Sequence, residues 1–519
     1  MAAVQGNILK GHGRDHQRFI FFRFGSRAEG LKLLRESAAA GGTLGTDRWV
    51  CSALNQRDQR DVHYSAWSAQ QTLMDPSVQF TDFDRNFLLA RINLAQTQIF
   101  SSLMLSLAGL EFLGLTPPPS DAFAAGMKAR MATMLKTDEM KEAPYHPDGG
   151  IHGMFLLACE DSTTLDNTIP ALDFWCRKHE TTLLKPYETG FTWRAPGNPY
   201  GNGYRPPREP FGFADGISQP LFFADQRTSP AMRQNQPTSD AWTTAGLEQV
   251  FLREPGHEGG SLVALLKIEQ KVATFRKYEQ DLADLLQKKL GLAADQASYV
   301  APAVLMGRTR EGYPLHEVIK PLPPTAQGLR ALFPAGPAAP GPNDPPPPPP
   351  SWLNEFDFEP PSGATQPATR GCPFHMHMRK MNPRVSQSPH GNRDSFVAAQ
   401  FVRRGTTYDP KGLLVAAEVA GGKNWPDKEV GLLFLAYMSD LSSQFETLHT
   451  FWSTDWTFPE LGGIDPVLAR PDPDPQKAPP SFKFGAATIP LTPSILRRLG
   501  GVYLYAPSLP WLQHAGLPR

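Results

Sequence analysis

Apolar runs of strand length alternate with helical patterns along both halves of this 519-residue chain. In the first half we predict strands at residues 19–24, 100–107 and 150–159, because each is a short apolar run bounded by turn residues. Helical patterns fill much of the sequence between and after them, at residues 30–40, 108–115, 122–135 and 162–179. This order is typical of an α+β fold in which helices cover an antiparallel sheet.

The second half repeats this alternation of strands and helices. Strands are predicted at residues 260–268, 396–403 and 430–437, with a short strand at 501–505 near the end of the chain. A long helix is predicted at residues 269–290, and residues 445–456 are expected to be partly helical. The similarity of the two halves is a weak indication of duplication.

The length of the chain predicts more than one domain, because 519 residues exceed what a single ordinary core supports. We place an N-terminal domain at residues 1–210 and a C-terminal domain at residues 211–519. Residues 334–361 form a proline-rich insertion, with six consecutive prolines at 345–350 that favour a polyproline II conformation. A surface insertion is the simpler interpretation, and a ligand for proline-binding modules is the alternative.

Charge and cysteine usage exclude several classes of protein. Lys plus Arg equals Asp plus Glu at 51 each, which argues against nucleic acid or an anionic membrane as the main partner. The four cysteines include no Cys-x-x-Cys pair, so neither a zinc site nor a disulfide framework is expected. The start lacks the apolar core of a signal peptide, and the longest apolar stretch, residues 99–115, contains polar residues. We therefore expect a cytoplasmic protein without a membrane span, and a homo-oligomer is left open.

Residues 371–384 contain the most reactive combination of side chains in the chain. His375 and His377 form a His-x-His pair close to Cys372 and to several cations. Imidazole is a common metal ligand and the usual proximal ligand of haem iron in peroxidases. The Asn-Pro step at 382–383 favours an extended or turn conformation just after the pair. The residues alone leave a metal site, a haem site and an ordinary histidine pair open.

The same stretch resembles the proximal-histidine motif of the dye-decolorising peroxidases, Cys-Pro-x-x-x-His-x-Arg-x-x-Asn-Pro-Arg. The matching positions are Cys372, Pro373, His377, Arg379, Asn382, Pro383 and Arg384. The family usually has small residues where this chain has His375 and Met376. His375 is therefore a competing imidazole two residues from the ligand that the resemblance implies, His377.

A second run, Gly-Phe-Ala-Asp-Gly at residues 212–216, is a strong turn signal through its Asp-Gly pair. It also resembles the Gly-x-x-Asp-Gly motif that defines the same family, and the match continues to Pro220. The resemblance assigns Asp215 to the distal face of the haem, where a positioned carboxylate can shuttle the proton of peroxide.

A third run, Arg-Arg-Gly-Thr-Thr-Tyr at residues 403–408, resembles the family's Arg-Arg-Gly-x-x-Tyr segment, although Thr407 replaces its proline. The resemblance makes Arg403 the group that stabilises negative charge on the departing oxygen, with Arg404 the less favoured choice. Leu432 and Phe434 share one face of a predicted strand and are similar to the apolar wall of the distal pocket. An ordinary core strand is an equally good interpretation of those two residues.

The resemblance covers most of the chain and implies a fold, a cofactor and an activity. It implies duplicated ferredoxin-like domains, with antiparallel sheets, peripheral helices and a haem pocket in the C-terminal half. Haem b (iron protoporphyrin IX) would be bound by His377 as proximal ligand, with Arg379 also at the cofactor. The implied reaction reduces hydrogen peroxide through a ferryl intermediate and oxidises dyes, phenols or other bulky aromatic donors by one-electron steps. By position, Glu446 and Asp440 are candidate partners for the second nitrogen of His377.

Two functions of other classes stay open at this point. A haem-binding or carrier protein with little turnover would bind haem but react with peroxide little faster than free haem does. A protein that binds a transition metal through His375 and His377 would show no haem absorption band.

Overall fold

The structure of the chain is a computed structural model. Apart from isolated positions, it describes residues 1–39, 49–56, 97–135, 150–194, 207–220, 245–312, 375–384, 387–459, 463–469, 481–484, 487–490 and 494–518. The proline-rich insertion and Cys372 lie outside these residues.

The apolar runs of the first half form neighbouring antiparallel strands, as predicted. Strand β1 (His16–Phe24) pairs on one side with β3 (Gly153–Cys159) and on the other with β4 (Thr181–Leu183) and β5 (Glu188–Phe191). Strand β2 (Phe100–Leu105) continues the sheet beyond β3. All residues of β2 and β3 are buried, which explains why both read as nearly continuous apolar sequence.

The strands of the second half are also antiparallel. Strand β8 (Ser261–Gln270) lies between β13 (Gly431–Met438) and β16 (Leu496–Ala506). The short strands β11 (Val402–Arg403) and β12 (Thr406–Tyr408) pair with opposite ends of β13. The predicted strands at 260–268 and 430–437 are thus confirmed, and the predicted strand at 501–505 is the second half of a longer one.

One sheet of ten strands joins the two halves in the described part of the chain. Strand β12 pairs with β5 through Thr407 and Phe191, and β16 pairs with β2 through Tyr505 and Leu105. The strand order closes on itself because β8 pairs with β13 as well as with β16. Strands from the two halves therefore share one network of backbone hydrogen bonds.

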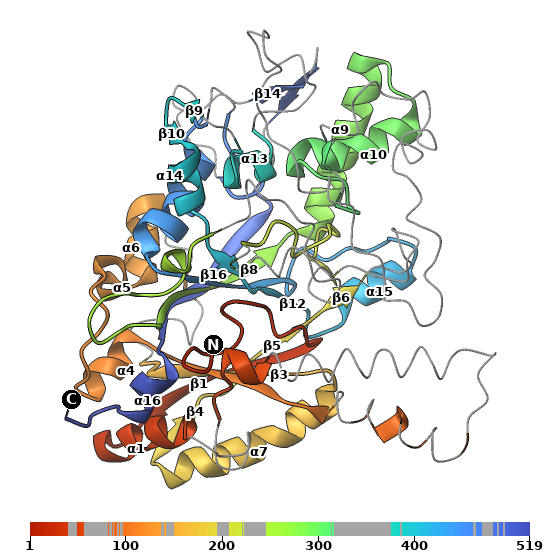
Figure 1. Cartoon of the computed structure of the whole chain (residues 1–519). Coiled ribbons are helices and arrows are strands. Elements are labelled where there is room, and N and C mark those ends of the chain that lie inside the picture. The colour runs from red at the N-terminus through yellow and green to blue at the C-terminus, as the bar shows by residue number, and fades with distance from the viewer. Residues whose placement is uncertain are drawn as a thin grey trace.

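The helices of the first half cover the outside of its strands (Figure 1), where α1 and α7 lie in the lower part of the view. Their bounds are α1 Arg27–Ser37, α4 Leu107–Phe112, α5 Asp121–Ala125, α6 Met127–Leu135 and α7 Ser162–Lys178. The prediction of a single helix at 122–135 is wrong, because Gly126 adopts a φ of 77° and separates α5 from α6. Glycine commonly ends helices at positive φ, where other residues are strained.

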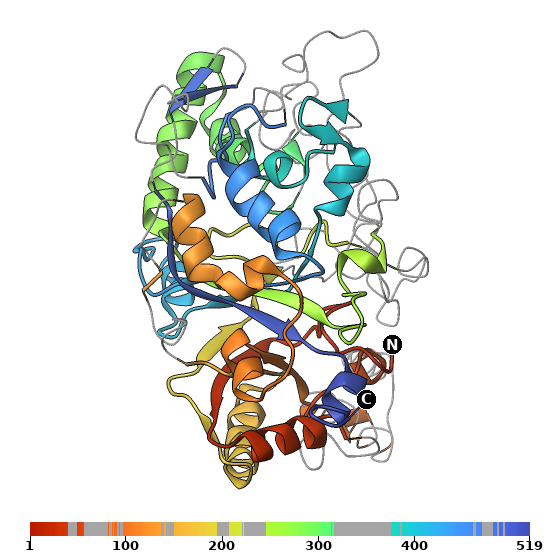
Figure 2. The same ribbon diagram turned by 90° about the vertical axis from the view of Figure 1, so that its left-hand side faces the viewer.

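The helices of the second half lie mostly in the upper part of Figure 1. They are η2 Leu247–Gln249, α9 Val272–Leu290, α10 Ala294–Met306, α13 His377–Met381, α14 Arg393–Ala398, α15 Leu413–Val419, the π-helix η5 Leu441–Trp452 and α16 Leu509–Gln513. Three further strand pairs are formed by β6 Trp193–Arg194 with β7 Pro207–Arg208, β9 Gln387–Ser388 with β10 Gly391–Asn392, and β14 Ser481–Phe484 with β15 Ala487–Pro490. Figure 2 shows η5 beside α5 and α6 on one side of the sheet.

The prediction of a strand at residues 396–403 is also wrong. The first part of this run belongs to α14, whose N-cap Asn392 accepts a hydrogen bond from the backbone N–H of Ser395. Only Val402 and Arg403 are in a strand. Short apolar runs do not distinguish helix from strand, and here the helix cap upstream decides the outcome.

The buried apolar residues form two large clusters on opposite faces of the sheet. Alternate residues of β13 show this division, because Ala436 and Met438 join one cluster while Leu433 and Leu435 join the other. The second cluster combines strand residues from both halves of the chain. None of the described helices is both long and apolar enough to cross a membrane.

Candidate active site

The loop that carries Asp215, residues 209–220 (the aspartate loop), is held by the side chain of Glu209. Its two carboxylate oxygens accept hydrogen bonds from the backbone N–H groups of Phe211 and Phe213, both at 3.0 Å. The side chain of Gln270 on β8 donates a third, at 2.7 Å. Burial raises the pKa of Glu209, and the two backbone N–H groups oppose that rise.

The backbone of Asp215 is fixed by a hydrogen bond from its N–H to the carbonyl oxygen of Pro207, at 2.8 Å. Its carboxylate Oδ1 accepts a hydrogen bond from the N–H of Gly216 at 2.6 Å. Gly216 has a φ of 80° and Gly212 a φ of 93°, which explains why both positions of the motif are glycine. The predicted turn is therefore present, and it leaves Asp215 half-buried.

Arg403 at the end of β11 is bonded to the aspartate loop. Its guanidinium Nη2 donates to the carbonyl oxygen of Ile217 at 2.7 Å, and its backbone N–H donates to Oε1 of Gln219 at 3.1 Å. Burial lowers the pKa of Arg403, and the negative charge of Asp215 opposes that shift. The structure thus brings Asp215 and Arg403, 188 residues apart in sequence (403 − 215), into one electrostatic environment.

Arg404 points to a different part of the chain. Its Nε donates to the carbonyl oxygen of Asn7 at 2.7 Å, and its Nη2 donates to that of Ile8 at 3.0 Å. Burial lowers the pKa of Arg404 to about 9. Of the two adjacent arginines, Arg403 is therefore the one bonded to the aspartate loop, while Arg404 binds the N-terminal leader.

Leu432 and Phe434 on β13 are half-buried, whereas Leu433 and Leu435 between and beyond them are fully buried. Because strand residues alternate in direction, Leu432, Phe434 and Ala436 share one face of the sheet. Arg403 lies opposite Ala436 in the antiparallel register, so its side chain is on that face too. Two partly exposed apolar side chains thus lie on the same face of the sheet as Arg403.

His377 is the first residue of α13, and its imidazole contacts a buried carboxylate. Nδ1 of His377 lies 2.8 Å from Oδ2 of Asp465, which is fully buried, while the histidine side chain is 24% exposed. Asp465 also accepts hydrogen bonds from the N–H groups of Val467 and Leu468 at 2.7 and 2.8 Å. Burial alone would raise the pKa of Asp465, but His377 and these N–H groups outweigh it and the pKa is lowered. With Nδ1 held in this way, Nε2 is the nitrogen able to bind a metal.

His375 lies in a different environment from His377. It is 1% exposed, and burial together with the positive charges of Lys380 and Arg379 lowers its pKa well below the usual range. Met376 between the two histidines is also fully buried. The two imidazoles of the His-x-His pair therefore do not share one exposed face.

Residues 375–384 (the histidine stretch) are linked to the aspartate loop through a serine. The Ser218 hydroxyl accepts hydrogen bonds from Nη2 of Arg384 and Nη2 of Arg308, both at 3.1 Å. Arg379 of the histidine stretch is buried as well, at 1% exposure. Arg308 and Arg384 thus bring two buried guanidinium groups to the aspartate loop, which makes this region suited to a ligand that carries carboxylates.

Asp465 is the residue that sequence reasoning missed. Both candidates named from the sequence serve other purposes: Glu446 binds Arg130 and Tyr503, and Asp440 caps the N-terminus of η5. Asp465 lies in the sequence Gly-Gly-Ile-Asp-Pro, which carries a turn signal but nothing that points to a histidine.

No family model matches the chain. Among curated proteins, it is 28% identical over 527 aligned positions to the multifunctional dye peroxidase DyP2 of Amycolatopsis sp., covering 98% of this chain and 94% of the relative. It is also 26% identical to the dye-decolorizing peroxidase AauDyP1 of Auricularia auricula-judae, with 80% of this chain and 75% of the relative covered.

Solved structures of similar proteins match nearly the whole chain. A DyP-type peroxidase of Anabaena sp. superposes with a TM-score of 0.69 at 23% identity, covering 99% of this chain and 94% of that one. The structure of DyP2 from Amycolatopsis sp. superposes with a TM-score of 0.68 at 25% identity, with 99% and 95% covered. These likenesses confirm the predicted α+β fold of duplicated ferredoxin-like units.

Proposed function

We infer that this chain is a haem peroxidase of the dye-decolorising type, which reduces hydrogen peroxide and oxidises dyes, phenols and related aromatic donors. Curated relatives with that name match it over 98% and 80% of its length. One structural observation carries the assignment of the site. The histidine stretch is bonded through Arg384 to Ser218 of the aspartate loop, far away in sequence, and Arg403 is bonded to the same loop.

The described residues fit haem b as the cofactor. Nε2 of His377 would bind the iron, because Asp465 already holds Nδ1. Leu432 and Phe434, which are apolar and partly exposed, would contact the porphyrin face, and Arg379 with its neighbouring arginines would offset its carboxylates. Bound haem would supply the iron that peroxide oxidises and that aromatic donors reduce again one electron at a time.

The residues around this cofactor site have distinct tasks in our proposal. Asp215 accepts the proton of hydrogen peroxide and returns it to the departing oxygen, as a general base and then a general acid. Arg403 stabilises the negative charge on that oxygen, because a guanidinium keeps its charge even when burial lowers its pKa. Asp465 orients His377 and strengthens it as a ligand through the contact with Nδ1.

We also propose that the chain comprises two units, residues 1–210 and 211–519. Strands β1 to β5 belong to the first and β8 to β16 to the second, which supports this division. The cytoplasmic location of the protein and the formation of a homo-oligomer stay predictions from the sequence.

The absorption spectrum before and after one equivalent of hydrogen peroxide tests the function. We expect purified protein supplied with hemin to show a Soret band that shifts rapidly with peroxide and returns when a phenol is added. A Soret band that only bleaches would favour a haem carrier. The absence of any Soret band would leave the transition-metal alternative for His375 and His377.

Asp215→Asn and Arg403→Leu test the tasks of the distal residues. Both variants should bind haem, and the peroxide-dependent Soret shift should slow by about 100-fold or more in stopped-flow measurements. Asp440→Asn is the matched control, because Asp440 caps η5 and asparagine is an equally good N-cap. Wild-type rates in both distal variants would refute the assignment.

The two histidines require a separate pair of variants. His377→Ala should abolish the spectrum of histidine-ligated haem, whereas His375→Ala should keep it, because the His377 ring is 24% exposed with its Nδ1 held by a carboxylate, whereas His375 is 1% exposed. The opposite outcome would make His375 the ligand.

A further inference from the structure

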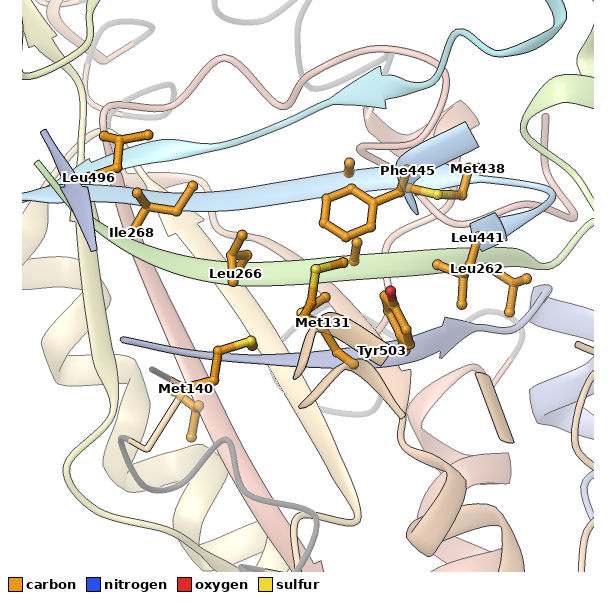
Figure 3. Packing of buried hydrophobic residues seen from close by; sticks show 14 of the residues in the cluster. Met131, Met140, Leu262, Leu266, Ile268, Met438, Leu441, Phe445, Leu496 and Tyr503 are labelled. Atoms are coloured by element: carbon orange, nitrogen blue, oxygen red, sulfur yellow. The ribbon is translucent and has the colours of Figure 1, made fainter. Parts of the chain in front are cut away.

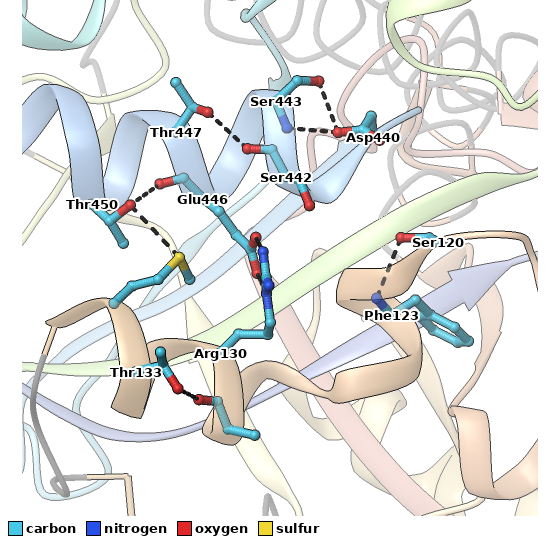
Figure 4. A network of polar contacts seen from close by, with 12 residues as sticks. Ser120, Phe123, Arg130, Thr133, Asp440, Ser442, Ser443, Glu446, Thr447 and Thr450 are labelled. Atoms are coloured by element: carbon cyan, nitrogen blue, oxygen red, sulfur yellow. Dashed lines mark hydrogen bonds and ion pairs between the residues drawn. The ribbon is translucent and has the colours of Figure 1, made fainter.

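A tyrosine, a glutamate and an arginine form a continuous set of contacts on η5, α6 and β16. The hydroxyl of Tyr503 donates a hydrogen bond to Oε1 of Glu446 at 2.8 Å. Nε of Arg130 donates to the same oxygen at 2.9 Å, and its Nη2 donates to Oε2, as Figure 4 shows. Tyr503 and Glu446 are 3% and 2% exposed, while the Arg130 side chain is 35% exposed. The network therefore runs from the core to solvent.

Tyr503 lies on the same face of the sheet as the proposed cofactor site. In the antiparallel registers, Arg403 lies opposite Ala436, Ala436 opposite Ala264, and Ala264 opposite Tyr503. Side chains at directly paired positions point to the same face, so this alignment places Tyr503 three strands from Arg403 on one surface. Adjacent strands are about 4.8 Å apart, which puts the two backbone positions roughly 14 Å apart.

A series of aromatic ring contacts connects Tyr503 with Phe434 of the proposed cofactor site. The ring centroids of Phe434 and Phe445 are 6.0 Å apart, and those of Phe445 and Tyr503 are 6.1 Å apart. His449 stacks on Phe445 at 5.2 Å. Figure 3 shows Phe445 and Tyr503 on the same side of the sheet. Tyr503 is thus connected by packed rings to Phe434, one of the residues proposed to contact haem.

The chemistry of the network favours loss of an electron together with a proton. Burial, and the negative charge of Glu446 beside it, raise the pKa of Tyr503 far above its usual value. A phenol with a raised pKa keeps its proton more firmly, so its oxidation needs a base for the released proton. Glu446 is within hydrogen-bond distance of that proton, and Arg130 offsets its charge.

We propose that Tyr503 is a redox-active residue whose oxidation is coupled to proton transfer to Glu446. One electron passes from the phenol to peroxide-oxidised haem, the O–H bond breaks, and the proton binds the Glu446 carboxylate. The products are a neutral tyrosyl radical and a carboxylic acid, still hydrogen-bonded to each other. An electron from an aromatic donor then reduces the radical, and Glu446 returns the proton. This proposal rests on the peroxidase function, which supplies the oxidant.

Freeze-quench electron paramagnetic resonance (EPR) of the haem-loaded protein after peroxide tests the proposal. We expect an organic radical whose hyperfine pattern narrows when the protein contains ring-deuterated tyrosine, and which is lost in Tyr503→Phe. Tyr505→Phe is the matched control, because Tyr505 is a buried tyrosine on the same strand whose hydroxyl contacts His257. The radical should persist in that variant.

Glu446→Gln tests the proton acceptor. It is an independent test, which still applies if Tyr503→Phe does not fold. Glutamine keeps the size of the side chain but is not a base, so the tyrosyl signal should fall to background while the peroxide-dependent Soret shift remains. A Soret shift without any tyrosine radical in the wild type would overturn the role of Tyr503 and leave the peroxidase function standing. An unchanged radical in Tyr503→Phe or Glu446→Gln would do the same. Loss of the Soret response in the wild type would instead contradict the peroxidase function.

Discussion

The contact between His377 and Asp465 determines which imidazole nitrogen is left to bind iron. Asparagine at position 465 would keep the size of the side chain but lose its charge, so the contact with Nδ1 would be weaker. Changes to such partners of metal ligands typically lower metal affinity by 10-fold to 100-fold. We therefore expect Asp465→Asn to bind hemin about tenfold more weakly or worse, measured by titration of the haem-free protein.

Asp440→Asn serves as the control for that titration, because it changes an aspartate to asparagine at a helix cap. Equal hemin affinities of wild type and Asp465→Asn would show that the carboxylate does not support the ligand.

At the residue scale, motifs identify side chains better than they identify partners. Asp215 and Arg403 were predicted from their own motifs, and the structure places them in one environment. Asp465, 88 residues after His377, could not be found in this way, because a tertiary contact brings the two together. The hydrogen bonds that favour Arg403 over Arg404 for the proposed role likewise come from tertiary contacts.

The aspartate loop depends on Glu209, which accepts hydrogen bonds from two of the loop's own N–H groups. Glu209→Ala removes both acceptors and should let the loop shift, whereas Glu209→Gln keeps one carbonyl oxygen and should have an intermediate effect. Small displacements of catalytic groups cost up to 100-fold in rate, so we expect the peroxide-dependent Soret shift of Glu209→Ala to slow by about tenfold with haem retained.

Glu248→Ala, at an exposed glutamate, is the control and should react at the wild-type rate. The loop would not depend on Glu209 if Glu209→Ala also reacted at that rate.

The N-terminal leader is attached to the sheet through Arg404, which donates to the carbonyl oxygens of Asn7 and Ile8. Arg404→Leu would leave these two acceptors without their donor. Each unsatisfied buried acceptor costs about 1–3 kcal/mol, so the free energy of unfolding should fall by about 2–6 kcal/mol in urea denaturation. Arg253→Leu, at a 73% exposed side chain, should change it by no more than about 0.5 kcal/mol. A similar change in the free energy of unfolding for both variants would show that Arg404 does not attach the leader to the sheet.

At the element scale, strongly patterned segments were predictable and short apolar runs were not. The strands at residues 260–268 and 430–437 are bounded by clear turns, and the structure has both. The run at 396–403 has the composition of a strand, but its N-cap Asn392 makes the first part a helix. The closure of the strand order through β8 and β13 depends on pairing between distant segments, which composition does not encode.

At the scale of the whole molecule, the first half supports a site whose proposed functional residues all follow residue 211. The leader binds Arg404 beside Arg403, and Arg130 binds Glu446 on η5. In our proposal the second unit therefore carries the chemistry, and the first unit contributes contacts that support it.

This division predicts that the two units unfold together. Their strands share hydrogen bonds at β5 with β12 and at β2 with β16, and one buried cluster combines Phe19 and Phe21 with Leu433 and Leu435. Chains of this length commonly unfold in several steps, but separating these units would expose apolar surface on both. We expect one calorimetric transition, coincident with the loss of far-ultraviolet circular dichroism, and no cooperative transition in fragment 1–210 or 211–519 alone. Two separate transitions, or a fragment that folds by itself, would show that the shared sheet is not what holds the halves together.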